Sequence, residues 1–176
     1  MSATTSKVPL AERVRALVSM TFTTRPDSRA SDVALGALRV ALAWIFLYYG
    51  AGKLFGWFNG PGLHAESLFM SNTAHLHPGG LFAVLGGVIE FFGGIAMVLG
   101  LGSRVAGLAL FGDQVMAMIT VTWANGINSE SLTPGYEFNV ALAVMALAIV
   151  CLGPGRASLD ALIERRLTRS RRPSAP

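Results

Sequence analysis

The chain of 176 residues is 52% hydrophobic and only 14% charged, whereas soluble domains carry about 25% charged residues, so lipid is the expected main solvent. The net charge is +4, but the basic residues gather at the two ends of the chain around an apolar middle, which argues against nucleic-acid binding and favours contact with anionic lipid. The single cysteine, Cys151, excludes an internal disulfide and dithiol chemistry within one chain.

An amphipathic segment followed by four long apolar stretches predicts a membrane protein. In residues 1–30, Leu10, Val14 and Leu17 recur at helical spacing among basic residues, which predicts an amphipathic helix on the membrane surface. Four apolar stretches follow, each near the roughly 20 residues that a spanning helix needs. They cover 31–55, 80–101, 105–124 and 136–152. We therefore predict an all-α, integral membrane four-helix bundle over residues 31–153.

The connections between these stretches differ in length. Only "GLGSR" separates the second and third stretches, which predicts a tight antiparallel hairpin. Residues 56–79 form a long outer loop, in which "HAESLFMS" predicts a short helix with Leu68 and Phe69 against the bundle. This helix is either a lid over an inner cavity or a packed cap. In residues 154–176, apolar residues at helical spacing opposite arginines predict a basic amphipathic helix, which a tail follows.

Positive charge orients the predicted bundle. Twelve of the 14 Lys and Arg residues lie before the first stretch, between the second and third, or after the fourth. The positive-inside rule then places both termini in the cytoplasm and makes the chain a multi-pass protein of the cytoplasmic membrane. Aromatic rings favour the membrane–water interface. At the outer rim of the predicted bundle, away from the cytoplasm, the aromatic residues are Trp57, Phe58, Trp123 and Tyr136.

Glu90 is the least expected residue of the apolar stretches. It lies about ten residues into the second stretch, which at 1.5 Å per residue puts it roughly 15 Å deep. The residues that share its face are glycines: Gly86, Gly87, Gly93 and Gly94. Small residues mark the surface where another helix approaches closely, so Glu90 is expected to point into the bundle.

Other polar residues accompany Glu90 in the predicted spans. Asp113 lies near mid-membrane beside Gln114, and Arg39 lies about a third of the way along the first stretch. Lys53, roughly on the face of Arg39, and Glu137 lie near the outer rim. If all the charges face one interior, two cations meet three carboxylates.

This surplus carboxylate has two interpretations. A buried charge costs about 2.5–3.5 kcal/mol unless it is paired, so the extra acid would be protonated, hydrated or bound to a ligand, as a proton relay or quinone site requires. Alternatively, the charges form a polar lock that holds the helices in register. Glu137 can also be a first-turn acid that the helix dipole favours.

The histidines His64, His75 and His77 all lie in the outer loop. A His-x-His pair binds metal only when further ligands converge, so these three are weak metal candidates. The predicted spans contain no histidine, which excludes bis-histidine haem ligation within the bundle.

Three pieces of the chain carry a resemblance to a known family: "LRVALAWIFLYYGAGKLF", "GGVIEFFGGIAMVLGLGSRVAGLAL" and "GPGRASLD". Over about residues 35–160 the sequence resembles the DoxX family of small four-helix membrane proteins. Lys53 matches the lysine of the family's G-x-K element, and Glu90 matches its glutamate before paired glycines. The resemblance implies a role in quinone- or sulfur-linked redox systems, as in the related DoxD subunit of thiosulfate:quinone oxidoreductase.

We expect a membrane subunit of a redox complex that offers a quinone or other lipophilic substrate to an acidic interior site. Glu90 and Asp113 would handle protons, while Lys53 and Arg39 would hold anionic groups or pair with the carboxylates. No cofactor motif is evident, so electron transfer would need a bound quinone or a soluble or membrane partner protein. The alternatives are a non-catalytic anchor that recruits soluble proteins through its basic helices, and a small permease. Homo-oligomerisation stays open.

Overall fold

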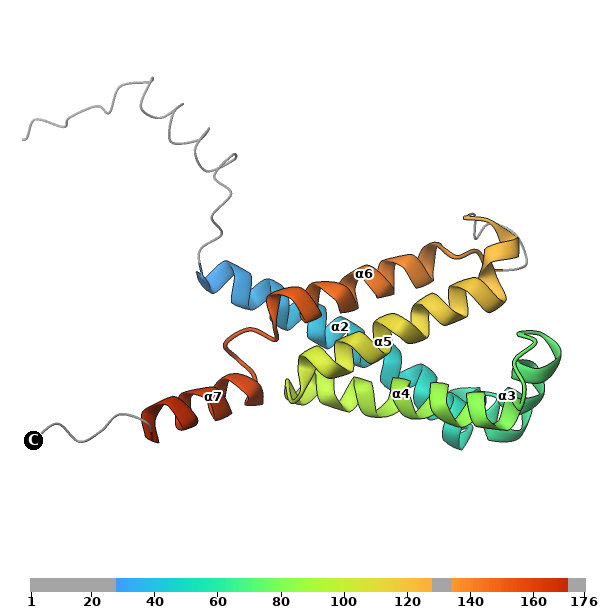
Figure 1. Ribbon diagram of the computed structural model, residues 1–176, viewed down its shortest axis with the longest axis horizontal. Helices are drawn as coiled ribbons and strands as arrows, with labels where there is room; N and C mark the ends of the chain where they lie inside the picture. The colour runs from blue at the N-terminus through green and yellow to red at the C-terminus, as the bar shows by residue number, and fades with distance from the viewer. Residues whose placement is uncertain (1–27, 128–133, 171–176) are drawn as a thin grey trace, which may run out of the picture.

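The computed structural model describes residues 28–127 and 134–170, which are almost entirely helical (Figure 1). The elements that build the bundle are α2 (Ser28–Phe55), α4 (Gly79–Leu99), α5 (Ser103–Ala117) and α6 (Glu137–Leu152). Two further helices are α3 (Gly62–Asn72) and α7 (Leu159–Ser170). The all-α prediction is confirmed for the described residues. The predicted N-terminal surface helix falls mainly in residues 1–27, outside them.

Short helical segments complete the connections. A 3-10 turn, Trp57–Asn59, follows α2. Helix α5 continues without a break into a π-helical stretch, Met118–Thr122, and a 3-10 turn, Trp123–Asn125. The predicted third span is therefore one helical rod in which the last two turns change their hydrogen-bond period.

Three helical rods are long and apolar enough to cross a membrane: 29–55, 79–99 and 103–125. Helix α6 is apolar but has 16 residues, about 24 Å at 1.5 Å per residue, against a hydrocarbon core of about 30 Å. The structure thus supports a membrane protein with three spanning helices, and the fourth crossing stays a prediction.

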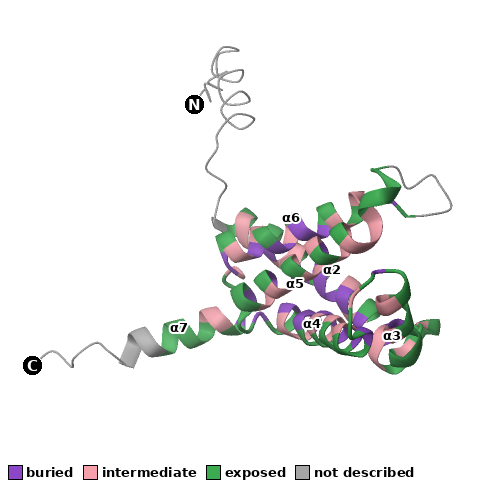
Figure 2. Ribbon diagram, turned by 45° about the vertical axis from the view of Figure 1, so that its right-hand side comes forward, coloured by how far each residue is buried: buried purple, intermediate pink, exposed green. Residues whose placement is uncertain are grey.

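The two ends of the bundle differ. Helix α3 lies at one end, beside the end of α2 and the start of α4, whereas the start of α2, the α4–α5 turn and α7 lie at the other (Figure 1). Helix α7 projects away from the bundle, and purple buried residues gather between the four bundle helices in Figure 2. We refer to these as the α3 end and the α7 end.

The core consists of side chains that the bundle helices turn toward one another. Phe46, Met97, Leu110 and Ile149 are each at most 1% exposed. On the outside, large apolar side chains stay open, with Trp44 77% exposed. Broad exposed apolar faces of this kind fit a lipid surrounding.

Glycines let α2 and α4 pack closely. A Cβ at Gly50 would lie 2.8 Å from the Cα of Phe91, and one at Gly94 would lie 2.8 Å from Cγ of Leu47. The prediction that the glycine stripe around Glu90 faces other helices is confirmed, since close backbone approach needs these positions to lack a side chain.

The predicted α4–α5 hairpin is confirmed and is held by the start of α7. Gly100 and Gly102 adopt left-handed φ angles of 63° and 58°, which glycine tolerates. The Asp160 carboxylate accepts hydrogen bonds from the backbone N–H groups of Gly102 (2.8 Å) and Ser103 (3.0 Å). Partial burial opposes ionisation, but these donors and the charge of Arg39 lower the pKa of Asp160 below its usual value.

Candidate functional site

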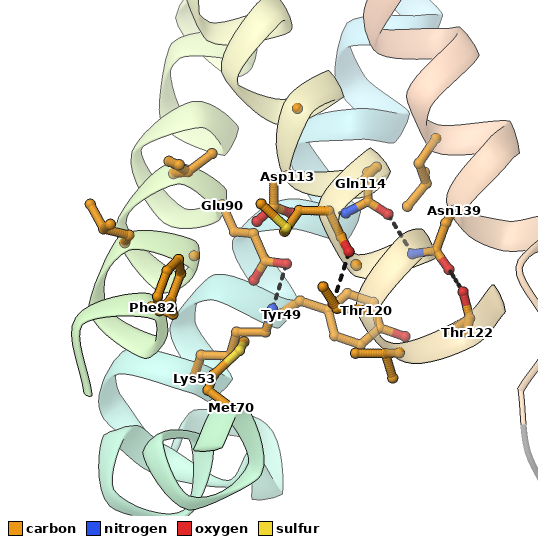
Figure 3. A pocket seen from close by; sticks show the side chains of 18 of the residues that line it. Tyr49, Lys53, Met70, Phe82, Glu90, Asp113, Gln114, Thr120, Thr122 and Asn139 are labelled. Atoms are coloured by element: carbon orange, nitrogen blue, oxygen red, sulfur yellow. Dashed lines mark hydrogen bonds and ion pairs between the residues drawn. The ribbon is translucent and has the colours of Figure 1, made fainter. Parts of the chain in front are cut away.

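A cavity of about 710 Å³ lies among the bundle helices toward the α3 end (Figure 3). Every bundle helix and α3 contribute to its wall. The lining is mostly apolar and rich in rings, including Phe46, Tyr49, Phe69, Phe82 and Phe138. Its size and its few convergent polar groups are typical of a small-molecule site.

Lys53 and Glu90 meet at the wall of this cavity. Lys53 Nζ on α2 donates a hydrogen bond of 2.8 Å to Glu90 Oε1 on α4. The two side chains can meet because α2 packs directly against α4 at this point. A Cβ at Gly87, one turn before Glu90, would lie 3.6 Å from the Cβ of Lys53. The prediction that Glu90 points inward is confirmed, since Glu90 is 4% exposed.

The second carboxylate oxygen of Glu90 has no hydrogen-bond partner among the described residues. Oε2 is buried and accepts no hydrogen bond from any described residue. A buried carboxylate oxygen without a donor costs on the order of 1–3 kcal/mol or more. Buried polar groups are normally satisfied, so this exception beside a cavity makes Glu90 a candidate binding residue.

Glu66 on α3 is a member of the site that the sequence did not reveal. It is 6% exposed, and its Oε1 lies 3.8 Å from Lys53 Nζ. Burial raises the pKa of Glu66 above its usual value, the positive charge of Lys53 opposes this rise, and Asp113 adds to it. One signal could have revealed it: Glu66 precedes Phe69 by three residues and so shares its helix face.

The predicted orientation of α3 was partly wrong. Phe69 lines the cavity, but Leu68 is 51% exposed and is not part of the cavity wall. The face turned inward carries Glu66, Phe69 and Met70. Because these side chains form part of the cavity wall, α3 covers this cavity rather than only capping the bundle.

Asp113 is held by a chain of side-chain hydrogen bonds (Figure 3). Gln114 Nε2 donates to Asp113 Oδ2, and Asn139 Nδ2 donates to Gln114 Oε1. Thr122 Oγ1 in turn donates to Asn139 Oδ1, and the donor–acceptor distance in each of the three hydrogen bonds is 3.0 Å. The chain joins α5, the π-helical stretch and α6. Asn139 and Thr122 line the cavity and were missed because isolated neutral polar residues carry no distinctive spacing.

Arg39 does not join the acidic site, and the expectation that it pairs with these carboxylates or holds an anion there was wrong. It lies toward the α7 end, where its guanidinium donates to four backbone oxygens, at 2.8–3.0 Å: those of Met97, Val98, Pro154 and Ala157. The first two belong to the last turn of α4, whose carbonyls lack helical partners. Arg39 therefore acts as a structural lock.

Glu137 also lies outside the cavity wall. It occupies the first turn of α6, as the helix-dipole interpretation expects, and its Oε2 is buried without a described partner. The hypothesis that five charges face one interior is thus wrong. Around the cavity the structure gathers Lys53 with three carboxylates: Glu66, Glu90 and Asp113.

The weak metal candidates gain no support. His64, His75 and His77 are all exposed at the α3 end. Within residues 28–127 and 134–170, no group of three His, Cys, Asp or Glu side chains is placed to hold a metal ion.

Comparison with known proteins gives one match. No curated protein and no solved structure matches the chain significantly. The model of the DoxX family matches residues 34–123, that is 123 − 34 + 1 = 90 of the 176 residues, or just over half. The matched segment contains all four charged residues of the cavity wall. The chain therefore belongs to the DoxX family, and its apolar helices make it a membrane protein of that family.

Proposed function

We propose that this protein is the membrane subunit of a quinone- or sulfur-linked redox complex, and that its cavity binds a quinone or a similar small lipophilic substrate. One observation carries the proposal: the buried carboxylate of Glu90 leaves Oε2 without a partner at the wall of an apolar cavity of about 710 Å³. Oε2 belongs to a side chain that lines the cavity, and no described residue donates a hydrogen bond to it. A bound molecule can supply that donor or share a proton with the oxygen.

The chemistry of the wall fits a quinone-type molecule. Apolar side chains and rings from Tyr49, Phe82 and Phe138 suit a flat ring with a hydrocarbon tail. The polar groups that could hold oxygen atoms are few and come from separate helices: Lys53, Glu66, Glu90, Asp113, Gln114 and Asn139. A mostly apolar cavity with a few fixed polar groups is the usual design of a small-molecule site.

The three carboxylates would serve the protons of the reaction. The described cavity wall carries three carboxylates, those of Glu66, Glu90 and Asp113, and one cation, Lys53. A bilayer interior disfavours the surplus negative charge, so one acid can take up and release a proton at modest cost. A quinone supplies two-electron redox chemistry when bound, and the electrons would pass to a soluble or membrane partner protein.

The charge distribution supports a placement in the cytoplasmic membrane with four crossings. The α7 end holds Arg104, Arg156, Arg165 and Arg166, and it would face the cytoplasm. Leu162 and Ile163 of α7 are 50% and 47% exposed. This helix would lie on the anionic inner leaflet with its apolar side in the lipid and its arginines near the headgroups.

Quinone analysis of the purified protein tests the proposal. The protein is extracted in mild detergent, washed, and its bound lipids are measured by mass spectrometry, beside the Glu90→Gln variant. We expect about one quinone or comparable lipophile per chain in the wild type and a loss of about tenfold in Glu90→Gln, since the amide alters the hydrogen bonds at Oε2. Glu137→Gln is the matched control, because Glu137 also has a buried unpaired oxygen but does not line the cavity.

Substitutions at two glycines test whether the bound molecule occupies this cavity. Gly112 lines the cavity, and Gly36 does not; a Cβ at either position meets nothing within 4 Å. Gly112→Leu should therefore place a side chain in the cavity and displace the lipophile, whereas Gly36→Leu should retain it. No lipophile in the wild type, or equal retention in both glycine variants, would overturn the proposal.

A further inference from the structure

The wall of the cavity contains a carboxylate oxygen, Glu90 Oε2, to which no described residue donates a hydrogen bond. Glu90 Oε1 accepts a hydrogen bond of 2.8 Å from Lys53 Nζ, but Glu90 Oε2 accepts none from the described residues. Lys53 already lies within 3.8 Å of a second carboxylate, that of Glu66. Its single positive charge is thus shared between two acids.

The neutral polar groups point the same way. In the chain from Thr122 through Asn139 and Gln114, each group donates toward the next, and the last donation ends on Asp113 Oδ2. The chain therefore delivers its donors to a carboxylate of the site. Asp113 Oδ1 receives no hydrogen bond from the described residues and lies on the cavity side, 3.7 Å from where a Cβ at Gly86 would be.

A ligand's own chemistry decides how well it suits such a wall. A quinone offers only carbonyl oxygens, which accept hydrogen bonds and are repelled by carboxylate oxygens. A hydroquinone or another phenol offers O–H groups, which donate. A hydroxyl donated to an ionised, water-excluded carboxylate makes one of the stronger hydrogen bonds available to a neutral ligand.

We infer that the cavity binds its lipophilic ligand through a hydroxyl group donated to Glu90 Oε2, so that it selects a hydroquinone or related phenol over the corresponding quinone. This inference rests on the proposed function, because it requires the cavity to be a ligand site. It adds the oxidation state and the bonding polarity of that ligand. Glu90, through its unpartnered oxygen, is the residue that sets the selectivity.

A series of three matched probes tests the inference on the full-length protein in lipid nanodiscs. The probes are a decyl-substituted benzohydroquinone, its dimethyl ether and the corresponding quinone, and equilibrium dialysis without oxygen gives each Kd. We expect the hydroquinone to bind about tenfold or more tightly than both other probes. The ether keeps the ring and the tail but removes the donor, so it isolates the contribution of the hydroxyl groups.

The Glu90→Gln variant then replaces a hydrogen-bond acceptor by a donor at one atom. Its amide can present an N–H group where Oε2 lay, so the preference for hydroquinone should shrink at least severalfold, while Glu137→Gln should keep the wild-type ratio. The wild-type series decides the inference even if Glu90→Gln does not fold. Equal binding of the three probes, or tighter quinone, overturns the inference and leaves the cavity as a ligand site. Binding of none of them overturns the proposed function as well.

Discussion

The intramembrane charges divide into two sets with different roles. The sequence left two interpretations open for all of them, a polar lock and a reactive site. Arg39 satisfies the first, because every acceptor that it binds is a backbone oxygen. Lys53 and Glu90 are different, since their pair leaves one buried carboxylate oxygen unpaired beside a cavity. A charge in a bilayer therefore has to be judged by its partners.

The lock role of Arg39 predicts a loss of stability on conservative substitution. Arg39→Lys keeps the charge, but an ammonium group cannot reproduce the planar fork that reaches carbonyls of α4 and of the segment after α6. Since hydrogen bonds to charged groups contribute about 1.5–3 kcal/mol each, the variant should lose about 3 kcal/mol or more. Thermal unfolding in detergent measures this loss.

Arg104→Lys is the matched control for that measurement. Arg104 is exposed and donates to one backbone oxygen, that of Val150, at 2.8 Å. This variant should change stability by less than about 1 kcal/mol. A similar loss in both variants would show that the α7 end tolerates no lysine, and Arg39 would lose its special role.

Sequence alone identified Lys53, Glu90 and Asp113 but not most of the polar residues around them. The glycine stripe predicted that Glu90 faces inward because close packing leaves a regular pattern of small residues. The partners of Arg39 were invisible, since backbone carbonyls 58 to 118 residues away carry no side-chain signal. Glu66 was missed for a related reason: α3 turns a carboxylate inward to meet Lys53, whereas hydrophobicity favours Leu68 there.

At the scale of elements, the packing of α2 against α4 depends on glycine. Gly50→Ala should lower stability by about 1–3 kcal/mol or more, because its Cβ would lie 2.8 Å from the Cα of Phe91 and a backbone cannot move aside locally. Displacing α2 would also separate Lys53 from Glu90. Thermal unfolding in detergent measures the loss.

The same helix supplies the control. A Cβ at Gly36 meets nothing within 4 Å, so Gly36→Ala should leave stability unchanged or raise it by up to about 1 kcal/mol through better helix propensity. Comparable losses at both positions would mean that α2 does not tolerate alanine for a reason other than contact with α4.

The helices were predictable and their local irregularities were not. Long apolar stretches and the short "GLGSR" link predicted α2, α4 and the rod 103–125 to within a few residues, because the length of an apolar stretch is a local property. The π-helical stretch Met118–Thr122 carries no comparable local signal. It contributes Thr120 and Thr122 to the cavity wall, and Thr122 donates a hydrogen bond to Asn139.

At the scale of the whole molecule, the two ends of the bundle have opposite character. The α7 end holds the arginine lock, the capped hairpin and the exposed basic residues, whereas the α3 end holds the cavity and a ring-rich surface. Stacked rings of Trp123 and Tyr136 and of Tyr48 and Phe58 add to that surface. Rings of this kind prefer the boundary of a bilayer, so we expect the asymmetry to follow the membrane normal.

This asymmetry predicts which end faces the cytoplasm. In a Cys151→Ala background, which removes the native thiol, His64→Cys places a thiol on the exposed face of α3 and Ala157→Cys places one at the exposed α7 end. A membrane-impermeant maleimide should label His64→Cys in right-side-out vesicles and Ala157→Cys only in inside-out vesicles, because positive charge is retained in the cytoplasm. The reverse pattern would invert the orientation. Labelling of both from one side would mean that the two ends do not lie across the bilayer, and the cavity would then open on the same side as the basic helix.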